Sequence, residues 1–182
     1  MILIDWARPA DFDSLENLIE ETFVETWSGL VDDEHIREHL TNGHARSVVD
    51  RFCRDIKSDI QVVRANDRLV GYAIGFCPDD HDSPRYYILG KLYLRSSVQG
   101  IGVGSRLWYR MIELGKASGA DGITLTHYPL NSRASRFYNR LGLKKVDETI
   151  YRCGNGEYRD WVLAATWGDL ELAASAKGVM AE

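Results

Sequence analysis

The sequence has few cysteines and no long apolar run, and these shortages argue against several classes of protein. Cys53, Cys77 and Cys153 stand far apart and form no CxxC pair. This argues against a disulfide framework or a zinc site and favours reduced thiols. No apolar run approaches the roughly 20 residues that cross a bilayer. The first residues lack a basic region and include Asp5, which is unlike a signal peptide. We therefore expect a cytoplasmic protein that does not cross a membrane.

Proline is also scarce, and basic residues do not outnumber acidic ones. There are four prolines among 182 residues, and no stretch rich in proline, glycine and serine divides the chain. The length suits one domain with a sizeable core. Lysine and arginine total 22 against 27 aspartates and glutamates, a net charge of −5. This balance argues against a general nucleic-acid binder and permits a cationic small-molecule partner.

What the sequence does contain is hydrophobic periodicity that predicts a mixed α/β domain with a central sheet and helices on its faces. The turn Asn66-Asp67 predicts a hairpin between two strands, and a short helix is expected from Trp167 onward. The predicted order is a strand, helices, three strands, a helix, a strand, a helix and two strands, over 2–7, 9–23, 32–40, 45–57, 60–65, 69–77, 86–94, 104–118, 123–127, 131–140, 143–151 and 158–165.

Glycine recurs at every second position where the strand 86–94 leads into a helix, at Gly100, Gly102 and Gly104. A helix start offers backbone N–H groups without partners and a partial positive charge, and glycines let a ligand approach closely. These features suit a phosphate group. The spacing alone fits a tight structural turn equally well. The P-loop and Rossmann patterns both fail, because Ser105-Arg106 follows the last glycine and the third glycine spacing is wrong.

The turn resembles the pyrophosphate loop of the GNAT (Gcn5-related) N-acetyltransferases. The family pattern Gln/Arg-x-x-Gly-x-Gly/Ala fits the segment from Gln99 to Gly104 position by position. A second family signature, Asn-x-x-Ala-x-x-Phe-Tyr-x-x-x-Gly-Phe, is similar to the segment from Asn131 onward, and only its last aromatic is changed, to Leu143. Because the order of elements also matches, the resemblance covers about residues 2–166.

The resemblance implies a fold and a cofactor. We expect a single GNAT-like α/β domain over residues 1–166 and a partly helical tail over 167–182. Its mixed central sheet would have about seven strands, splayed between strands 4 and 5, with helices on both faces. Acetyl-CoA would bind where the strands 86–94 and 123–127 splay apart. No metal is implied.

The resemblance also implies roles for individual residues. Backbone groups of Leu92, Tyr93 and Leu94 would pair with the pantetheine arm, and the Leu94 N–H would polarise the thioester carbonyl. Asn131 would hydrogen-bond the end of the pantetheine, and Tyr138 would protonate the leaving thiolate, which a phenol with a pKa near 10 can do. The pyrophosphate would be held by Gln99, Gly100, Ile101, Gly102, Val103, Gly104 and Ser105.

Structural alternatives stand beside these roles. Tyr138 can be a core aromatic, although Phe137 is the better core candidate, and Asn131 can be a helix cap. The general base stays open, because neither splayed strand carries a carboxylate and Thr126 stands where some relatives have glutamate. Strand alternation places His127 on the face opposite Thr126, so a structural role is favoured. The remaining candidates for the base are Glu21, Glu25, His81 and a chain of waters.

The first helices and the loop 79–82 are acidic, which is usually a solvated face. Glu21, Glu25 and Trp27 lie at the helix end that would face the cleft, where acidic and aromatic groups can hold a polycation. The surrounding stretch loosely resembles bacterial spermidine/spermine-type acetyltransferases, which implies a small cationic amine as acceptor. Two alternatives are a protein N-terminus or lysine as the acceptor, and an acyl-CoA-binding module without turnover. An exposed edge strand in the final hairpin permits a homodimer.

Overall fold

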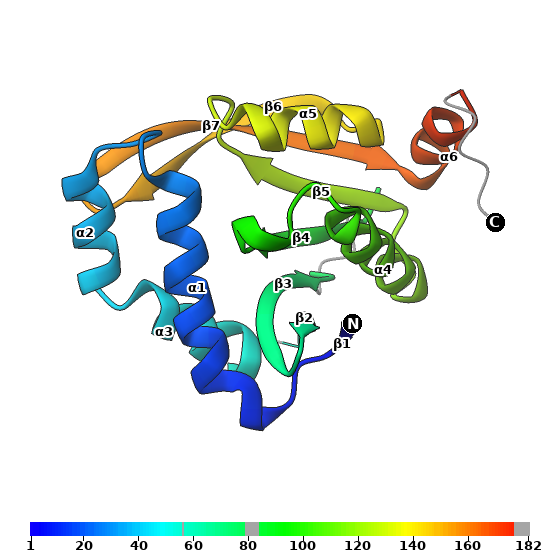
Figure 1. Cartoon of the computed structure of the whole chain (residues 1–182). Coiled ribbons are helices and arrows are strands. Elements are labelled where there is room, and N and C mark those ends of the chain that lie inside the picture. Colours follow the sequence, from blue (N-terminus) through cyan, green and yellow to red (C-terminus); the bar gives the residue numbers. More distant parts are fainter. Residues whose placement is uncertain (56, 79–83, 177–182) are drawn as a thin grey trace.

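The computed structural model describes residues 1–55, 57–78 and 84–176. Its seven strands form one mixed sheet in the order β1-β2-β3-β4-β5-β7-β6 (Figure 1), which confirms the predicted fold class. The strands are β1 (Ile2–Trp6), β2 (Asp59–Ala65), β3 (Arg68–Phe76), β4 (Tyr86–Leu94), β5 (Gly122–His127), β6 (Lys144–Cys153) and β7 (Gly156–Thr166).

The helices begin and end close to the predicted positions, since most of their termini carry local signals. Asp32 caps α2 by accepting a hydrogen bond from the Glu34 N–H at 2.8 Å. The predicted helix over 45–57 is a short α-helix that continues in wider π-helical turns. The helices are η1 (Pro9–Asp11), α1 (Phe12–Trp27), α2 (Asp33–Thr41), α3 (His44–Val48), η2 (Val49–Asp55), η3 (Ser96–Val98), α4 (Val103–Ala117), α5 (Ser132–Leu141) and α6 (Trp167–Ser175).

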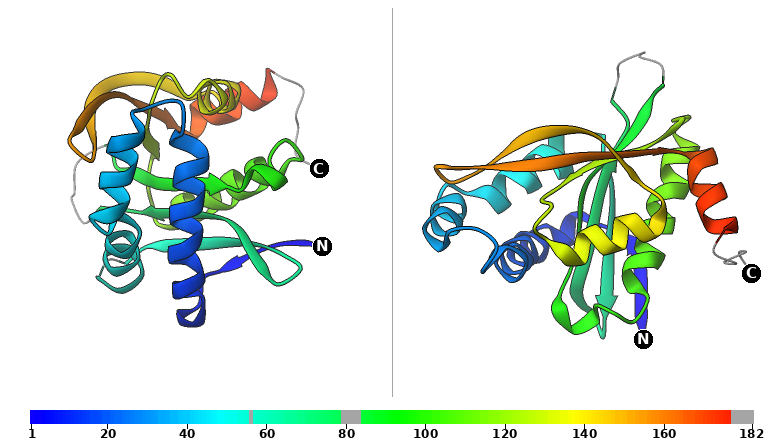
Figure 2. Two further views of the ribbon diagram at one scale, coloured as in Figure 1. Left: turned by 60° about the vertical axis from the view of Figure 1, so that its left-hand side comes forward. Right: turned by 90° about the horizontal axis from the view of Figure 1, so that it is seen from above.

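Helices cover both faces of the sheet, with α1 and α3 on one side and α4 and α5 on the other (Figure 2). On the first side, Leu15 and Leu18 of α1 pack with Val62 of β2 in one apolar core. On the second side, Leu107 of α4 packs with Ile123 of β5 in another. Each helix buries one apolar stripe, as its residue spacing predicts. The two cores hold the sheet between them.

The hairpins show how far local signals determine the strands. Asn66 and Asp67 both have positive φ, 47° and 63°, so the predicted turn between β2 and β3 is confirmed. The last hairpin is longer than predicted, because β6 and β7 pair as far as Cys153 and Gly156 across a two-residue turn. Cys153 is fully buried. Its burial beneath α2 favours extension of the strand to the turn, which is a tertiary effect that the local sequence does not carry.

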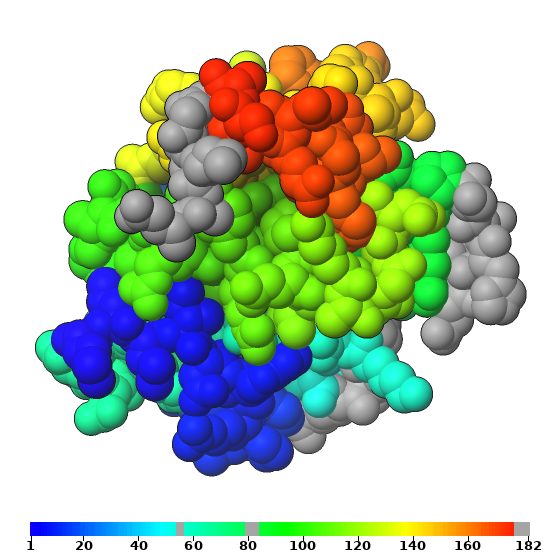
Figure 3. Space-filling model, turned by 90° about the vertical axis from the view of Figure 1, so that its right-hand side faces the viewer, coloured from blue at the N-terminus to red at the C-terminus, as the bar shows by residue number. Residues whose placement is uncertain are grey.

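Helix α6 packs on the same core as α4 and α5. The Trp167 indole N–H donates to the Ala120 carbonyl at 2.6 Å, and Lys116 of α4 pairs with Glu171 at 2.9 Å. Figure 3 shows this helix lying directly against α4. The predicted boundary at residue 166 falls between β7 and this helix. Within the ranges that the structure describes, no helix is long and apolar enough to span a membrane.

The sheet opens between β4 and β5, and this opening positions the site. The two parallel strands pair only where Tyr86–Ile88 faces Gly122–Thr124. Beyond that point, β4 continues to Leu94 and β5 to His127 without pairing to each other. The register of β4 also shifts around Gly90, because Leu89 and Lys91 face consecutive residues of β3. The predicted splay between strands 4 and 5 is therefore present.

Candidate functional site

The glycine-rich turn lies beside the opening and presents an exposed backbone. Gly100 and Gly102 have positive φ, 78° and 85°, and a Cβ atom built at either position would meet nothing within 4 Å. Helix α4 begins at Val103, and Arg106 makes the first four-residue hydrogen bond, from its N–H to the Gly102 carbonyl at 3.1 Å. The amides before Arg106 therefore precede the helical ladder. This arrangement suits a phosphate group at a helix N-terminus.

Side chains brace this turn from both sides. The Gln99 amide donates to the Leu94 carbonyl at 2.7 Å and so ties the turn to the end of β4. From α1, Glu25 accepts the Ser96 N–H at 2.8 Å and Glu21 pairs with Arg95. The two carboxylates that the sequence assigned to the acceptor are thus engaged in fastening α1 to the turn.

Tyr138 lies on α5 and faces the side of the sheet that α4 covers. Its ring packs near Trp108 and His127, with centroid separations of 6.2 and 5.7 Å. Burial and the nearby Tyr93 raise the pKa of Tyr138, so its phenol keeps its proton at neutral pH. Sequence reasoning was wrong about the neighbouring residue, because Tyr138 is buried and Phe137 only half-buried. Phe137 covers the start of α4 next to Gly104.

Two further predicted positions have defined surroundings. Asn131 caps α5, since its side-chain oxygen accepts the Ala134 N–H at 3.1 Å. This leaves its amide N–H₂ for a ligand. His127 is buried against Trp161 and Tyr138, and burial lowers its pKa. Thr126 is exposed on the opposite face of β5, in line with strand alternation.

The other face of the opening carries what we call the acceptor-side cluster: Trp27, Tyr93, Tyr128, Tyr151 and Tyr158. Trp27 is its centre, stacked on Tyr128 and Tyr151 with centroids 5.7 and 5.2 Å away. The Trp27 indole N–H donates to the Tyr93 hydroxyl at 3.4 Å. Tyr128 meets Tyr158 edge-on at 5.7 Å. Trp27, which the sequence placed at the cleft, thus contacts side chains from two strands, β4 and β6, and from the connection that follows β5.

Sequence reasoning missed two charged residues on this face. Asp160 of β7 is 4% exposed, its Oδ1 atom makes no hydrogen bond within the described part of the chain, and burial raises its pKa to about 6. Lys91 of β4 is half-buried, and burial lowers its pKa to about 8. Burial, and then the nearby Lys91, lower the pKa values of His39 and His44. Period-two alternation places Asp160 on the same face of β7 as the apolar Ala164. An acidic residue on that face was the sequence signal that could have identified Asp160.

An open hollow adjoins the cluster through Tyr158. It is lined by residues 29–32 of the loop between α1 and α2, including Asp32, and by Asp33, the first residue of α2. The Tyr158 hydroxyl bonds to His35 Nδ1 at 2.7 Å and accepts the Asp32 N–H at 3.3 Å, which ties the hollow's wall to β7. Its rim is therefore acidic. His81 and the acidic loop 79–82 lie outside the described residues. Among the residues described, no group of His, Cys, Asp and Glu is arranged to hold a metal ion.

Comparison with known proteins places this geometry in a family. The sequence profile of the Acetyltransferase (GNAT) family matches residues 12–143. An uncharacterized N-acetyltransferase of Mycobacterium tuberculosis is 28% identical over 153 residues, which cover 84% of this chain and 96% of that protein.

Solved structures share the fold. PaiA N-acetyltransferase from Thermoplasma acidophilum, in complex with coenzyme A, aligns with a TM-score of 0.72 at 18% identity, covering 92% of this chain and 99% of that one. Arabidopsis thaliana Naa50, in complex with the bisubstrate analogue CoA-Ac-MVNAL, aligns with a TM-score of 0.60 at 17% identity, covering 91% and 99%.

Proposed function

The chain belongs to the GNAT family of acetyltransferases, and from this premise we propose that it transfers the acetyl group of acetyl-CoA to the primary amine of a small cationic acceptor. The observation that carries the proposal is the turn from Gly100 to Ser105, exposed over 100–102, beside the opening between β4 and β5, with the protonated Tyr138 on the adjoining helix. The coenzyme A in the similar PaiA structure supports the choice of donor.

In this proposal the chain holds acetyl-CoA at two places. The amides that precede the ladder of α4 bind the diphosphate, together with the Ser105 hydroxyl. The edge of β4 that no longer pairs with β5, from Leu92 to Leu94, binds the pantetheine arm as a strand would. The free amide N–H₂ of Asn131 completes this contact. The Gln99 bond to Leu94 keeps the two binding places in register.

The transfer itself needs an acid for the leaving sulfur. The amine lone pair forms the new C–N bond as the Leu94 N–H polarises the thioester carbonyl. The C–S bond then breaks, its electron pair stays on the sulfur, and Tyr138 supplies a proton to the thiolate. The proton released by the new amide nitrogen restores the phenol. The buried phenol keeps its proton between turnovers, so the proton is present when the thiolate forms.

The acceptor side supports a cationic amine. Asp32 and Asp33 line the hollow, and the acceptor-side cluster offers aromatic faces to an ammonium group. These features support the loose resemblance to spermidine/spermine-type members. A protein N-terminus is the second candidate acceptor. The openness of the hollow and the peptide-bearing analogue bound by Naa50 favour it.

Replacing Tyr138 by phenylalanine tests the catalytic proposal. We expect kcat to fall by about 10²–10⁴-fold, the usual contribution of a general acid, with coenzyme A affinity changed less than about threefold. The assay measures coenzyme A release with a panel of primary amines, and isothermal titration gives the affinity. Tyr109→Phe, at a tyrosine of α4 that is 50% exposed, is the control. Full activity in Tyr138→Phe would refute the tyrosine acid, and coenzyme A binding without turnover of any amine would refute catalysis.

A further inference from the structure

We propose that Asp160 is the carboxylate that binds the ammonium group of the acceptor and takes its proton before attack. This inference rests on the proposed function and deepens it, because it assigns the base that neither splayed strand supplies. It also moves the acceptor's anionic contact from Glu21 and Glu25, which brace the turn, to the buried end of the acceptor-side cluster.

The register of the sheet places Asp160 at the opening. The last pair between β5 and β7 joins His127 to Trp161, so Asp160 stands one residue beyond the end of β5. On its other side, Asp160 faces Thr149 of β6, while Tyr151 faces Tyr158. Side chains two residues apart share one face of a strand, so Asp160 lies on the same face as the cluster tyrosines of β6 and β7.

The Asp160 carboxylate is buried without a compensating partner. Asp160 is 4% exposed, and its Oδ1 atom has no hydrogen-bond partner among the described residues. Burying a charge without a partner costs stability. The fold therefore retains a carboxylate at a position where a neutral side chain would be the more stable choice, which is expected of a functional group.

Lys91 is a cation on this face, but burial is the cause of the raised pKa of Asp160 and Lys91 does not offset it. Burial is the main cause that raises the pKa values of Tyr93 across the opening and of Tyr151 on β6, and the Asp160 carboxylate adds to it, so both remain neutral phenols. Lys91 acts instead on His39 and His44, and burial and Lys91 lower the pKa values of both imidazoles. Tyr158 of β7, Cys153 of β6 and His35 of α2 also lie around this face. Within the described chain, the counter-charge must therefore come from a ligand.

The surroundings identify the ligand as a protonated primary amine. Aromatic faces around a buried carboxylate favour a compact cation over a neutral or anionic group. The proton balance is simple: the ammonium loses one proton to Asp160 and becomes the neutral nucleophile, and the carboxylic acid later releases that proton to solvent. Burial raises the pKa of Asp160 to about 6, which suits a base that operates near neutral pH.

The test compares Asp160→Asn with Glu157→Gln, a solvent-exposed carboxylate three residues away on the same strand that pairs with Arg152. Tyramine, 1,4-diaminobutane and phenylalanine amide serve as acceptors. We expect Asp160→Asn to lower kcat/KM at least 100-fold at pH 7.5 and to keep coenzyme A affinity. The wild-type kcat/KM should fall with unit slope below pH 6, and this limb should disappear in Asp160→Asn. The control variant should match the wild type in each measurement.

Thermal unfolding separates this role from a structural one. The folded-state pKa of Asp160 is raised, so its charge destabilises the folded state above pH 6, and this cost fades as the pH falls toward 4. Asp160→Asn should therefore unfold at an equal or higher temperature than the wild type at pH 7.5, whereas a structural carboxylate would give a lower one.

Direct binding keeps the two proposals distinguishable. Titration of the same amines into the coenzyme A complex should show affinity in the wild type and at least tenfold weaker affinity in Asp160→Asn. If the wild type binds amines but does not acetylate them, the proposed function fails and the Asp160 site stands. If Asp160→Asn keeps the wild-type rate, pH profile and amine affinity, the Asp160 proposal is overturned and the proposed function stands. Failure of every amine to bind the wild type overturns the Asp160 site.

Discussion

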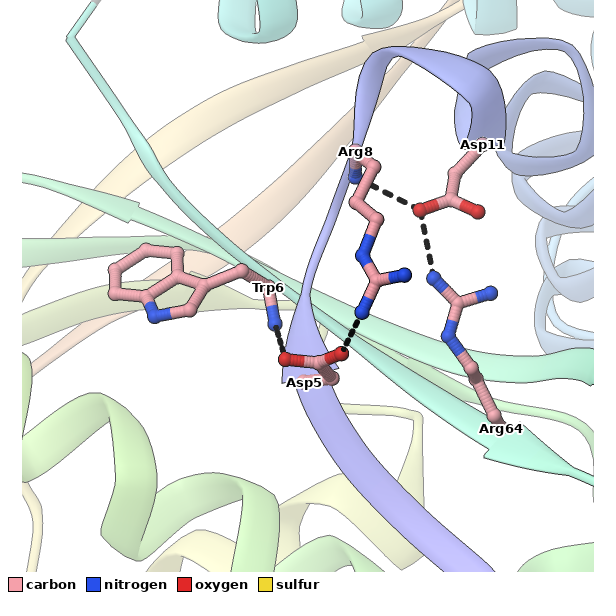
Figure 4. A network of polar contacts seen from close by, with 5 residues as sticks. All are labelled: Asp5, Trp6, Arg8, Asp11 and Arg64. Carbon is pink, nitrogen blue, oxygen red and sulfur yellow. Dashed lines mark hydrogen bonds and ion pairs between the residues drawn. The ribbon is translucent and has the colours of Figure 1, made fainter.

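Two charged residues of this protein, Asp11 and Asp160, show how differently a carboxylate can be placed: one is paired in a network that joins elements, and the other is buried at the opening with an oxygen that has no hydrogen-bond partner among the described residues. Asp11 accepts hydrogen bonds at 2.7 Å from the Arg64 side chain and from the Arg8 backbone, while the Arg8 side chain reaches Asp5 at 2.8 Å (Figure 4). This network joins the start of α1 to β1 and β2. Paired in this way, the charges serve the fold rather than a ligand.

Asp11→Asn should reduce stability in a way that depends on pH. The hydrogen bond from Arg64 is the main reason that the pKa of Asp11 is lowered below its usual 3.8. Its stabilisation is therefore full above about pH 4 and is lost as the pH falls through the lower folded-state pKa. We expect a loss of about 1–3 kcal/mol at pH 7, typical of a charged hydrogen bond, measured by urea unfolding. The loss should shrink at pH 3.

Asp13→Asn is the matched control, since Asp13 is an exposed aspartate in the next turn. It should change the free energy of unfolding by at most about 1 kcal/mol, the scale of a helix-dipole interaction. Equal stability of the two variants at pH 7 would contradict the role given to the Asp11 network.

At the scale of elements, two glycines flank α4, and substituting each of them separates an effect on ligand binding from an effect on helix stability. Gly102 precedes its first turn and Gly119 follows its last, with φ of 85° and 79°. A Cβ atom at either position would meet nothing within 4 Å. The backbone strain of an alanine is therefore the same at both ends of the helix, whereas only Gly102 lies in the proposed diphosphate turn.

Gly102→Ala and Gly119→Ala should each lose about 1–2 kcal/mol of stability, the cost of a left-handed conformation for a residue with a side chain. Only Gly102→Ala should weaken coenzyme A binding, by at least tenfold, because the strained turn misaligns its amides. Isothermal titration measures the affinity and urea unfolding the stability. Equal coenzyme A affinity in both variants would show that the turn does not bind the diphosphate.

The elements themselves were largely predictable from sequence because their signals are local. β4 was predicted with both ends correct, and the Asn131 cap and the stop of α4 at Gly119 follow from residue type and spacing. The ends of the last hairpin were not predictable, because burial of Cys153 under α2 extends β6 to the turn. Tertiary packing, rather than propensity, determines that length.

At the scale of the whole molecule, the donor side of the site could be predicted and the acceptor side could not. The turn and Tyr138 belong to contiguous sequence patterns. Glu21 and Glu25 look like free acidic residues until the chain folds, because their partners Arg95 and Ser96 lie 74 and 71 residues away. Asp160 could not be identified from the sequence for the same reason. Only the assembled sheet shows that β5 ends at His127 and leaves Asp160 of β7 without a paired residue on that strand.

The central claim is that the turn grips the diphosphate of acetyl-CoA and thereby aims the thioester at Tyr138. The most direct test is a crystal structure of the wild-type protein with coenzyme A. We predict diphosphate oxygens within hydrogen-bond distance of the amides from Gly100 to Ser105, and the coenzyme A sulfur next to the Tyr138 hydroxyl. A diphosphate bound elsewhere, or a Tyr138 hydroxyl turned away from the sulfur, would contradict the account.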